Sequence, residues 1–252
     1  TVGAFVGPLF ATALMLLFVG DFRAVFWVAV VPAVLAVMLL LFGVREPEPA
    51  AEGAAGSPIR RELLGRLGRA YWAVVAIGGV FTLARFSEAF LVLRAEQLGV
   101  AASFVPLVMV AMNLVYALSA YPFGKLADTM SHATLLAWGL GVLVAADVVL
   151  ALASSWPAML LGVALWGLHM GMTQGLLSAM VADTAPQDLR GTAFGLFNLV
   201  SGLAMLAASG IAGLLWDRLG ASSTFLAGAM FAVAALVALV GWAASRTATR
   251  AT

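Results

Sequence analysis

The chain has 252 residues, of which 63% are hydrophobic and 10% are charged, and its formal net charge is +1. Soluble domains carry about 25% charged residues, so this composition and a mean hydropathy of +1.07 exclude a soluble globular protein. The near-neutral charge without a continuous basic patch argues against a nucleic-acid partner, and the absence of cysteine excludes disulfides and cysteine-ligated metal sites.

Apolar runs long enough to cross a hydrocarbon core of about 30 Å as helices recur along the chain. Because these runs are continuous and do not alternate at every second residue, helices are favoured over the strands of a barrel. We therefore predict an all-α fold, a polytopic transmembrane helix bundle. The expected spans are residues 2–19, 24–43, 71–95, 102–122, 134–153, 157–182, 192–215 and 223–243.

The first span contains the sequence GAFVGPLFA, in which Gly3, Gly7 and Ala11 are spaced four apart and Pro8 follows the second glycine. Small residues at this spacing allow another helix to approach closely, and proline loosens a helix. The pattern therefore predicts a packing face and a kink. The chain begins inside this apolar run, without the charged leader of a signal peptide, so we expect its true N-terminus to be missing.

The one long loop, residues 45–69, divides two expected spans from six. Its first half is rich in Pro, Glu, Ala and Gly, as flexible linkers are. Its second half places Ile59, Leu63, Leu64 and Leu67 on one face and arginines elsewhere. This half is expected to form a short amphipathic helix on the cytoplasmic membrane surface. Anchoring of the neighbouring spans by the arginines alone is the alternative.

Lysine and arginine are concentrated in the cytoplasmic loops of membrane proteins. Their unequal distribution here predicts that both ends of this chain are cytoplasmic. One side holds Arg45, Arg60, Arg61, Arg66, Arg69, Lys125, Arg190, Arg246 and Arg250, whereas the other side holds Arg23, Arg94 and Arg218.

The third span contains two charged residues, Arg85 and Glu88, in the stretch FTLARFSEAFLVL. A charged side chain near the bilayer centre costs about 2.5–3.5 kcal/mol by insertion scales, so it needs a partner or a wet cavity. Three residues apart on one helix, the two side chains would share a face. In a cavity, Arg85 would be a fixed positive charge, and Glu88 could carry a proton. An intrahelical ion pair without a transport role is the alternative.

The sixth span contains the sequence LGVALWGLHMGMTQG, which forms two stripes when residues are placed 100° apart. One stripe is rich in glycine and suits close contact with another helix. The second stripe would then face a cavity. The glycine stripe comprises Gly167, Gly171, Gln174 and Gly175, and the second comprises Trp166, His169 and Thr173.

Polar residues in the remaining spans are weaker candidates for a transport pathway. They are Asn113 and Tyr116 in the fourth span and Asn198 in the seventh. Asp147 lies deep in the fifth span, where we expect a paired structural role.

Two segments resemble motifs of the major facilitator superfamily. The first span is similar to the fifth-helix antiporter motif of that family, with Ala11 where glycine is usual. The sequence GKLADTMSH, residues 124–132, resembles the family's G-x-L-A-D-R-x-G-R loop at the place of its copy between helices 8 and 9. Gly124, Leu126 and Asp128 match that loop, whereas Thr129, Ser131 and His132 replace its arginine and its Gly-Arg pair.

A third segment, ADTAPQDLRGTAFGLFNLVSG at residues 182–202, resembles the connection between helices 10 and 11, with Arg190 in its turn. The spans would then be helices 5–12 of a twelve-helix transporter with an incomplete N-terminal half. Residues 1–44 would end that half, residues 45–70 would form the cytoplasmic linker, and residues 71–252 would form the C-terminal six-helix half-bundle. A weak internal echo supports this, because a shift of 199 residues places Gly3 on Gly202 and Phe26 on Phe225.

The family lines its central cavity with helices 1, 4, 7 and 10. The resemblance therefore implies that the third and sixth spans, which carry Arg85, Glu88 and the Trp166 stripe, face the substrate. It also implies alternating-access transport of a small solute, with Gly3, Gly7, Pro8, Gly124, Asp128 and Arg190 in motif or gating positions.

The proline motif of the first span favours proton-coupled efflux, with import or facilitated diffusion as the alternative. We expect a monomer without a cofactor in a bacterial cytoplasmic (inner) membrane, because the composition suggests a GC-rich bacterial source. A non-transporting membrane protein is the alternative from another class. A channel is disfavoured because no filter-like loop interrupts a span. An intramembrane enzyme using His169 with Ser178 or Asp183 is disfavoured because neither H-E-x-x-H nor Gly-x-Ser-x-Gly occurs.

Overall fold

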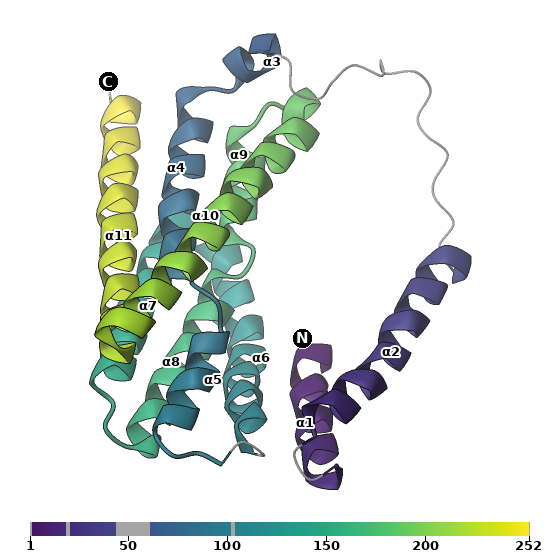
Figure 1. Cartoon of the computed structure of the whole chain (residues 1–252). Coiled ribbons are helices and arrows are strands. Elements are labelled where there is room, and N and C mark those ends of the chain that lie inside the picture. Colours follow the sequence, from purple (N-terminus) through teal and green to yellow (C-terminus); the bar gives the residue numbers. More distant parts are fainter. Residues whose placement is uncertain (1, 19–20, 44–60, 102–103, 252) are drawn as a thin grey trace.

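The computed structural model describes residues 2–18, 21–43, 61–101 and 104–251 (Figure 1). Every regular element in these ranges is a helix, which confirms the predicted all-α class. The helices are α1 Val2–Leu17, α2 Phe22–Gly43, α3 Arg61–Arg66, α4 Arg69–Ala84, α5 Ala89–Gln97, α6 Pro106–Thr129, α7 His132–Leu152, α8 Trp156–Thr173, α9 Leu176–Thr184, α10 Arg190–Leu219 and α11 Ala221–Ala251, with a 3-10 turn at Gln187–Leu189.

Within the described ranges, 7 stretches of helix are long and apolar enough to cross a membrane. They coincide with seven of the expected spans. The remaining expected span corresponds to α1, which has 16 residues. The third and sixth spans are each divided into two helices, α4 with α5 and α8 with α9. Their positions were predicted, but the interruptions within them were not.

The helix α4 lies at the centre of a bundle in which it packs against α10 and α11, while α7 packs between α8 and α11 (Figure 1). On the other side of α8 lies α6, against which α1 packs. The apolar stretch of α2 has none of its residues buried, and Figure 1 shows α2 diverging from the bundle. The part that buries its side chains thoroughly is therefore α4 to α11.

The glycine stripe of α8 forms the close contact with α6 that was predicted from its spacing. A Cβ on Gly167 would overlap the carbonyl oxygen of Met112, and one on Gly171 would lie 2.9 Å from the Cβ of Ser119. Such proximity requires glycine, because any other residue would push the two backbones apart. Gly175 does not extend this contact. It has a φ of +81°, which glycine adopts readily, and it precedes α9.

Arg94 is buried, although the sequence placed it among loop residues on the outer side of the membrane. Arg94 as a whole is only 7% exposed. The guanidinium donates to the carbonyl oxygens of Leu150 at 3.3 Å and Ala153 at 2.6 Å, and to Oε1 of Gln97 at 2.7 Å. Arg94 thus satisfies carbonyls at the C-terminal end of α7, where a positive charge is favourable, and ties α5 to it.

The expected amphipathic helix of the long loop is represented by α3, which has six residues. Ile59 lies outside the described residues, and so does the preceding linker to residue 44. Leu67, which was expected to face lipid, is 3% exposed and lies in the hydrophobic core, against which Leu64 packs. These two leucines therefore hold the segment before α4 against the bundle.

Candidate functional site

The third span is interrupted at residues 85–88, between α4 and α5. Arg85 caps the end of α4 with φ −106° and ψ 67°, and its N–H donates to the carbonyl of Thr82 at 3.1 Å. Glu88 stands at the N-cap of α5. The expectation that Arg85 and Glu88 share one helix face is therefore wrong, because the helix is broken between them. Broken helices in membranes occur where the backbone lines a cavity or is covered by protein.

A pocket of about 260 Å³ lies at this break. It brings together three residues that the sequence singled out, Arg85 and Glu88 from the break and Trp166 from α8. It also contains Phe86, Ser87 and, from α10, Met205, which sequence reasoning missed. Ser87 could have been noticed as a polar residue between the two charges. Met205 could not, because its contribution depends on how α10 crosses α4.

The two charged residues of the pocket do not form an ion pair with each other. The ion pairs found among the described residues involve other side chains. The guanidinium of Arg85 lies 5.6 Å from the centre of the Phe81 ring, a cation–π distance, and it is within electrostatic reach of Glu88 and Tyr116. Both Arg85 and Glu88 are half-buried. The pocket therefore presents a positive and a negative group that remain able to bind a third group.

The second stripe of α8 divides between two neighbours. Trp166 faces the pocket, whereas His169 is 0% exposed and its Nδ1 donates to the carbonyl of Gly139 on α7 at 2.7 Å. This bond places the ring proton on Nδ1, and Nε2 is buried without a hydrogen-bond partner in the described part of the chain. Thr173 donates to the carbonyl of His169 at 2.9 Å and packs against Gly139. Roles for His169 and Thr173 in transport stay predictions.

The weaker candidates do not line the pocket. Asn113 donates to the carbonyl of Met109 on its own helix at 2.8 Å. Tyr116 is half-buried on α6, and Asn198 is exposed on α10.

Asp147 on α7 is 0% exposed. Neither of its carboxyl oxygens has a hydrogen-bond partner among the described residues. The described residues therefore supply no partner of the kind that we expected for it.

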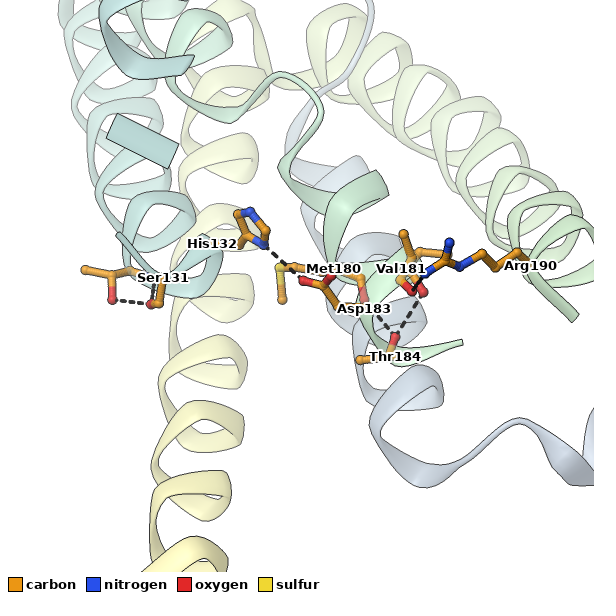
Figure 2. A network of polar contacts seen from close by, with 9 residues as sticks. Ser131, His132, Met180, Val181, Asp183, Thr184 and Arg190 are labelled. Atoms are coloured by element: carbon orange, nitrogen blue, oxygen red, sulfur yellow. Dashed lines mark hydrogen bonds and ion pairs between the residues drawn. The ribbon is translucent and has the colours of Figure 1, made fainter. Parts of the chain in front are cut away.

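A second pocket, of about 760 Å³, lies at the end of the bundle that carries the motif loops. Asp128, Ser131 and His132 of the 124–132 segment line it together with Asp183 of α9 and Trp242 of α11. Figure 2 shows His132 and Asp183 pointing toward each other, with 3.2 Å between Nδ1 and Oδ2. Ser131 accepts a hydrogen bond from the N–H of Thr134 at 3.1 Å and so caps α7.

The 182–202 segment joins several parts of the same end of the bundle. Its Asp183 binds His132, and its Asp188 accepts a hydrogen bond of 2.6 Å from Arg66, which ends α3. Arg190 donates to the carbonyl of Ala182 at 3.3 Å (Figure 2). The motif segments identified at 124–132 and 182–202 are therefore in direct contact.

The glycines of the first-span motif make no close packing contact among the described residues, because a Cβ on Gly3 or Gly7 would meet nothing within 4 Å. The same holds for Gly124 of the 124–132 segment. The side chain of Pro8 lies outside the described residues. In α1 the side chains buried near α6 are instead Thr12 and Met15.

Comparison with known proteins agrees with this arrangement. A family model described as Major Facilitator Superfamily matches residues 83–251, which include the pocket and both contacting motif segments. The chain is 30% identical over 239 residues to an uncharacterized MFS-type transporter of Methanocaldococcus jannaschii; the alignment covers 92% of this chain and 59% of that relative. The chain thus spans less than two thirds of the relative's length. By the family model and this relative, and in agreement with its helical bundle, the chain belongs to the Major Facilitator Superfamily.

Proposed function

We propose that this chain is the part of an alternating-access transporter that holds the solute at the break between α4 and α5. The observation that carries the proposal is the pocket of about 260 Å³ formed by Arg85, Glu88 and Trp166. Two half-buried charged groups in a transmembrane stretch are costly unless they meet water, a partner or a solute. A small polar solute would supply the hydrogen-bonding or charged partners that Arg85 and Glu88 do not provide for each other.

The division of the chain proposed from the resemblance fits this role. Residues 1–44 would end one half-bundle, residues 45–70 would link it to the next, and residues 71–252 would form the half-bundle that contains the pocket. Sites of this kind lie between two related halves of a transporter. The pocket would accordingly form one wall of a site near the middle of the membrane.

We further propose that transport is efflux coupled to inward proton movement. Glu88 can exchange a proton from its place in the pocket, whereas Arg85 retains its charge. The resemblance of the first span to an antiporter motif supports the direction. Solute import or facilitated diffusion by the same fold is the alternative. The proposed setting is a bacterial cytoplasmic membrane, with the protein acting as a monomer.

Counterflow of candidate solutes in vesicles that contain the complete protein tests this proposal. The solute that binds is first identified by its exchange across the membrane without a gradient. Its flux is then measured with and without an imposed pH gradient. Antiport predicts that the gradient drives the solute against its own concentration difference. Equal flux in both conditions would reject proton coupling and favour facilitated diffusion.

A further inference from the structure

The buried carboxyl group of Asp147 is not used by the pocket described above. It lies on α7, between α8 and α11, at 0% exposure, and both oxygens lack hydrogen-bond partners among the described residues. An ionised carboxyl in that position would lose its hydration without gaining a hydrogen bond or an ion pair, at a cost of several kcal/mol. The neutral acid avoids most of this cost. The site is therefore suited to a carboxyl group that holds a proton.

Other titratable and charged groups on the neighbouring helices are engaged elsewhere or lie farther along the bundle. His169 of α8 binds the carbonyl of Gly139, about two turns before Asp147 on α7. Arg94 of α5 donates to backbone carbonyls beyond Asp147 and not to its carboxyl group. Residues 221–245 of α11 contain no titratable side chain. The remaining groups are Arg85 and Glu88 at the helix break, Glu96 on α5, His132 at the start of α7, Asp183 on α9, and Tyr116, Tyr121, Lys125 and Asp128 on α6.

The Phe86 ring and the Asp147 carboxyl group lie on either side of the glycine of α11. An added Cβ on Gly228 of α11 would be 2.7 Å from Oδ2 of Asp147 and 2.7 Å from Cε1 of Phe86. The acid and the ring therefore flank one point, which a residue without a side chain leaves open. Phe86 and Gly228 also line a narrow space of about 10 Å³, whose other lining residues are mostly apolar.

Phe86 also belongs to the pocket of Arg85 and Glu88. This side chain thus borders both the solute pocket and the glycine beside the buried acid. Its ring is buried and packs against Phe90, Trp166 and Phe225. Phe86 stands in the broken segment between α4 and α5, so its backbone is not fixed by the regular hydrogen bonds of a helix interior. A movement of the break that carries the Phe86 ring away would open a path from Asp147 to water in the pocket.

We propose that Asp147 is a proton-binding site of this transporter and exchanges its proton with the Arg85–Glu88 pocket past the Phe86 ring. In the exchange the O–H bond of the acid breaks, the proton passes to a water molecule, and a carboxylate remains that the open pocket hydrates. The reverse transfer restores the neutral acid when Phe86 returns. This inference rests on the proposed transport function, because the proton held by Asp147 would be the one that the transporter carries.

Infrared spectroscopy of the complete protein in lipid tests the proposal without a solute. A protonated carboxyl group absorbs at a C=O stretching position that a carboxylate lacks, and the band shifts when its proton is exchanged for deuterium. We expect such a band at neutral pH in the wild-type protein, its loss in Asp147→Asn, and its retention in the control Asp217→Asn, whose side chain is exposed on α10. A band that persists in Asp147→Asn would overturn the assignment.

The role of Phe86 is tested by the rate at which this band shifts in D₂O. Phe86→Leu opens the path and should speed the exchange by about tenfold or more, whereas Phe197→Leu, a buried residue of α10 that packs beside Gly78 and does not line the pocket, should leave it near the wild-type rate. Equal rates in the two variants would overturn the proposed path. If Asp147→Asn does not fold, Asp147→Glu is measured in its place. The C=O band of the protonated acid should then shift in position but remain present. A band at the wild-type position in Asp147→Glu would overturn the assignment.

The vesicle experiment and the infrared experiment can fail separately. Flux that ignores the pH gradient would reject the coupling proposed for the whole transporter. The infrared bands alone decide whether Asp147 holds and exchanges a proton.

Discussion

The guanidinium of Arg94 on α5 donates a hydrogen bond of 2.6 Å to the carbonyl of Ala153, the C-cap residue of α7. Two further acceptors, on Leu150 and Gln97, complete its contacts. This one side chain holds the second half of a broken span against a continuous neighbour. The pocket at the break depends on that position of α5, so Arg94 supports the site without lining it.

Replacing Arg94 should therefore destabilise the bundle. Arg94→Met retains much of the apolar volume but leaves the Leu150 and Ala153 carbonyls without this donor, and we expect a loss of about 1–3 kcal/mol. The measurement is thermal unfolding of the purified protein in detergent. Arg218→Met is the matched control, because Arg218 is exposed. An unchanged unfolding temperature for Arg94→Met would contradict the structural role.

The contact between α6 and α8 should be sensitive to a single methyl group. In Gly167→Ala the new Cβ would overlap the Met112 carbonyl and lie 3.3 Å from the N–H nitrogen of Tyr116. We expect a loss of stability of about 1–3 kcal/mol, the usual cost of overpacking. Gly141→Ala on α7 is the control, since its Cβ would meet nothing within 4 Å. The account of this contact fails if both variants unfold at the same temperature.

The ion pair between Arg66 and Asp188 should contribute little to stability despite its distance of 2.6 Å. Both side chains are more than half exposed, at 54% and 56%, and exposed pairs contribute about 0–1 kcal/mol. A double-mutant cycle with Arg66→Gln and Asp188→Asn measures the coupling free energy, which salt should weaken. A coupling energy well above this range would show that the contact is more than a surface pair.

The orientation in the membrane can be tested by cysteine labelling, because this chain has no cysteine of its own. Gln187→Cys lies near the Arg66 end of the bundle, and Ser154→Cys follows α7 at the opposite end; both positions are exposed. A membrane-impermeant maleimide should label Ser154→Cys in intact cells and Gln187→Cys only after the membrane is opened. The reverse pattern would contradict the orientation drawn from the arginine distribution.

The helices and their order could be predicted because each depends on a local property, a long apolar run. The contact between α8 and α6 was also predictable, since the spacing of Gly167 and Gly171 lies within one helix. The break at 85–88 was not, because the residues RFSE contain neither glycine nor proline to signal a helix end. In α8 the signal existed, and Gly175 marks that interruption with a positive φ.

Only some of the residues that line the pocket could be predicted from the sequence. Arg85 and Glu88 stand out because charge is rare in an apolar run, and Trp166 because it shares a helix stripe. The remaining relationships depend on how distant helices cross. Sequence gives no indication that Asp147 and Phe86 flank Gly228, or that Arg94 turns inward to α7 and not outward to the interface.

In the function proposed above, the pocket at the α4–α5 break links the movement of the solute to that of the proton. The most direct test is pH-gradient-driven flux through vesicles containing Glu88→Gln in the complete protein. The control is Glu96→Gln, which changes an exposed glutamate on the same helix α5 outside the pocket. The account predicts that Glu88→Gln lowers gradient-driven flux to the level seen without a gradient, while Glu96→Gln transports like the wild type. Full gradient-driven flux in Glu88→Gln would contradict it.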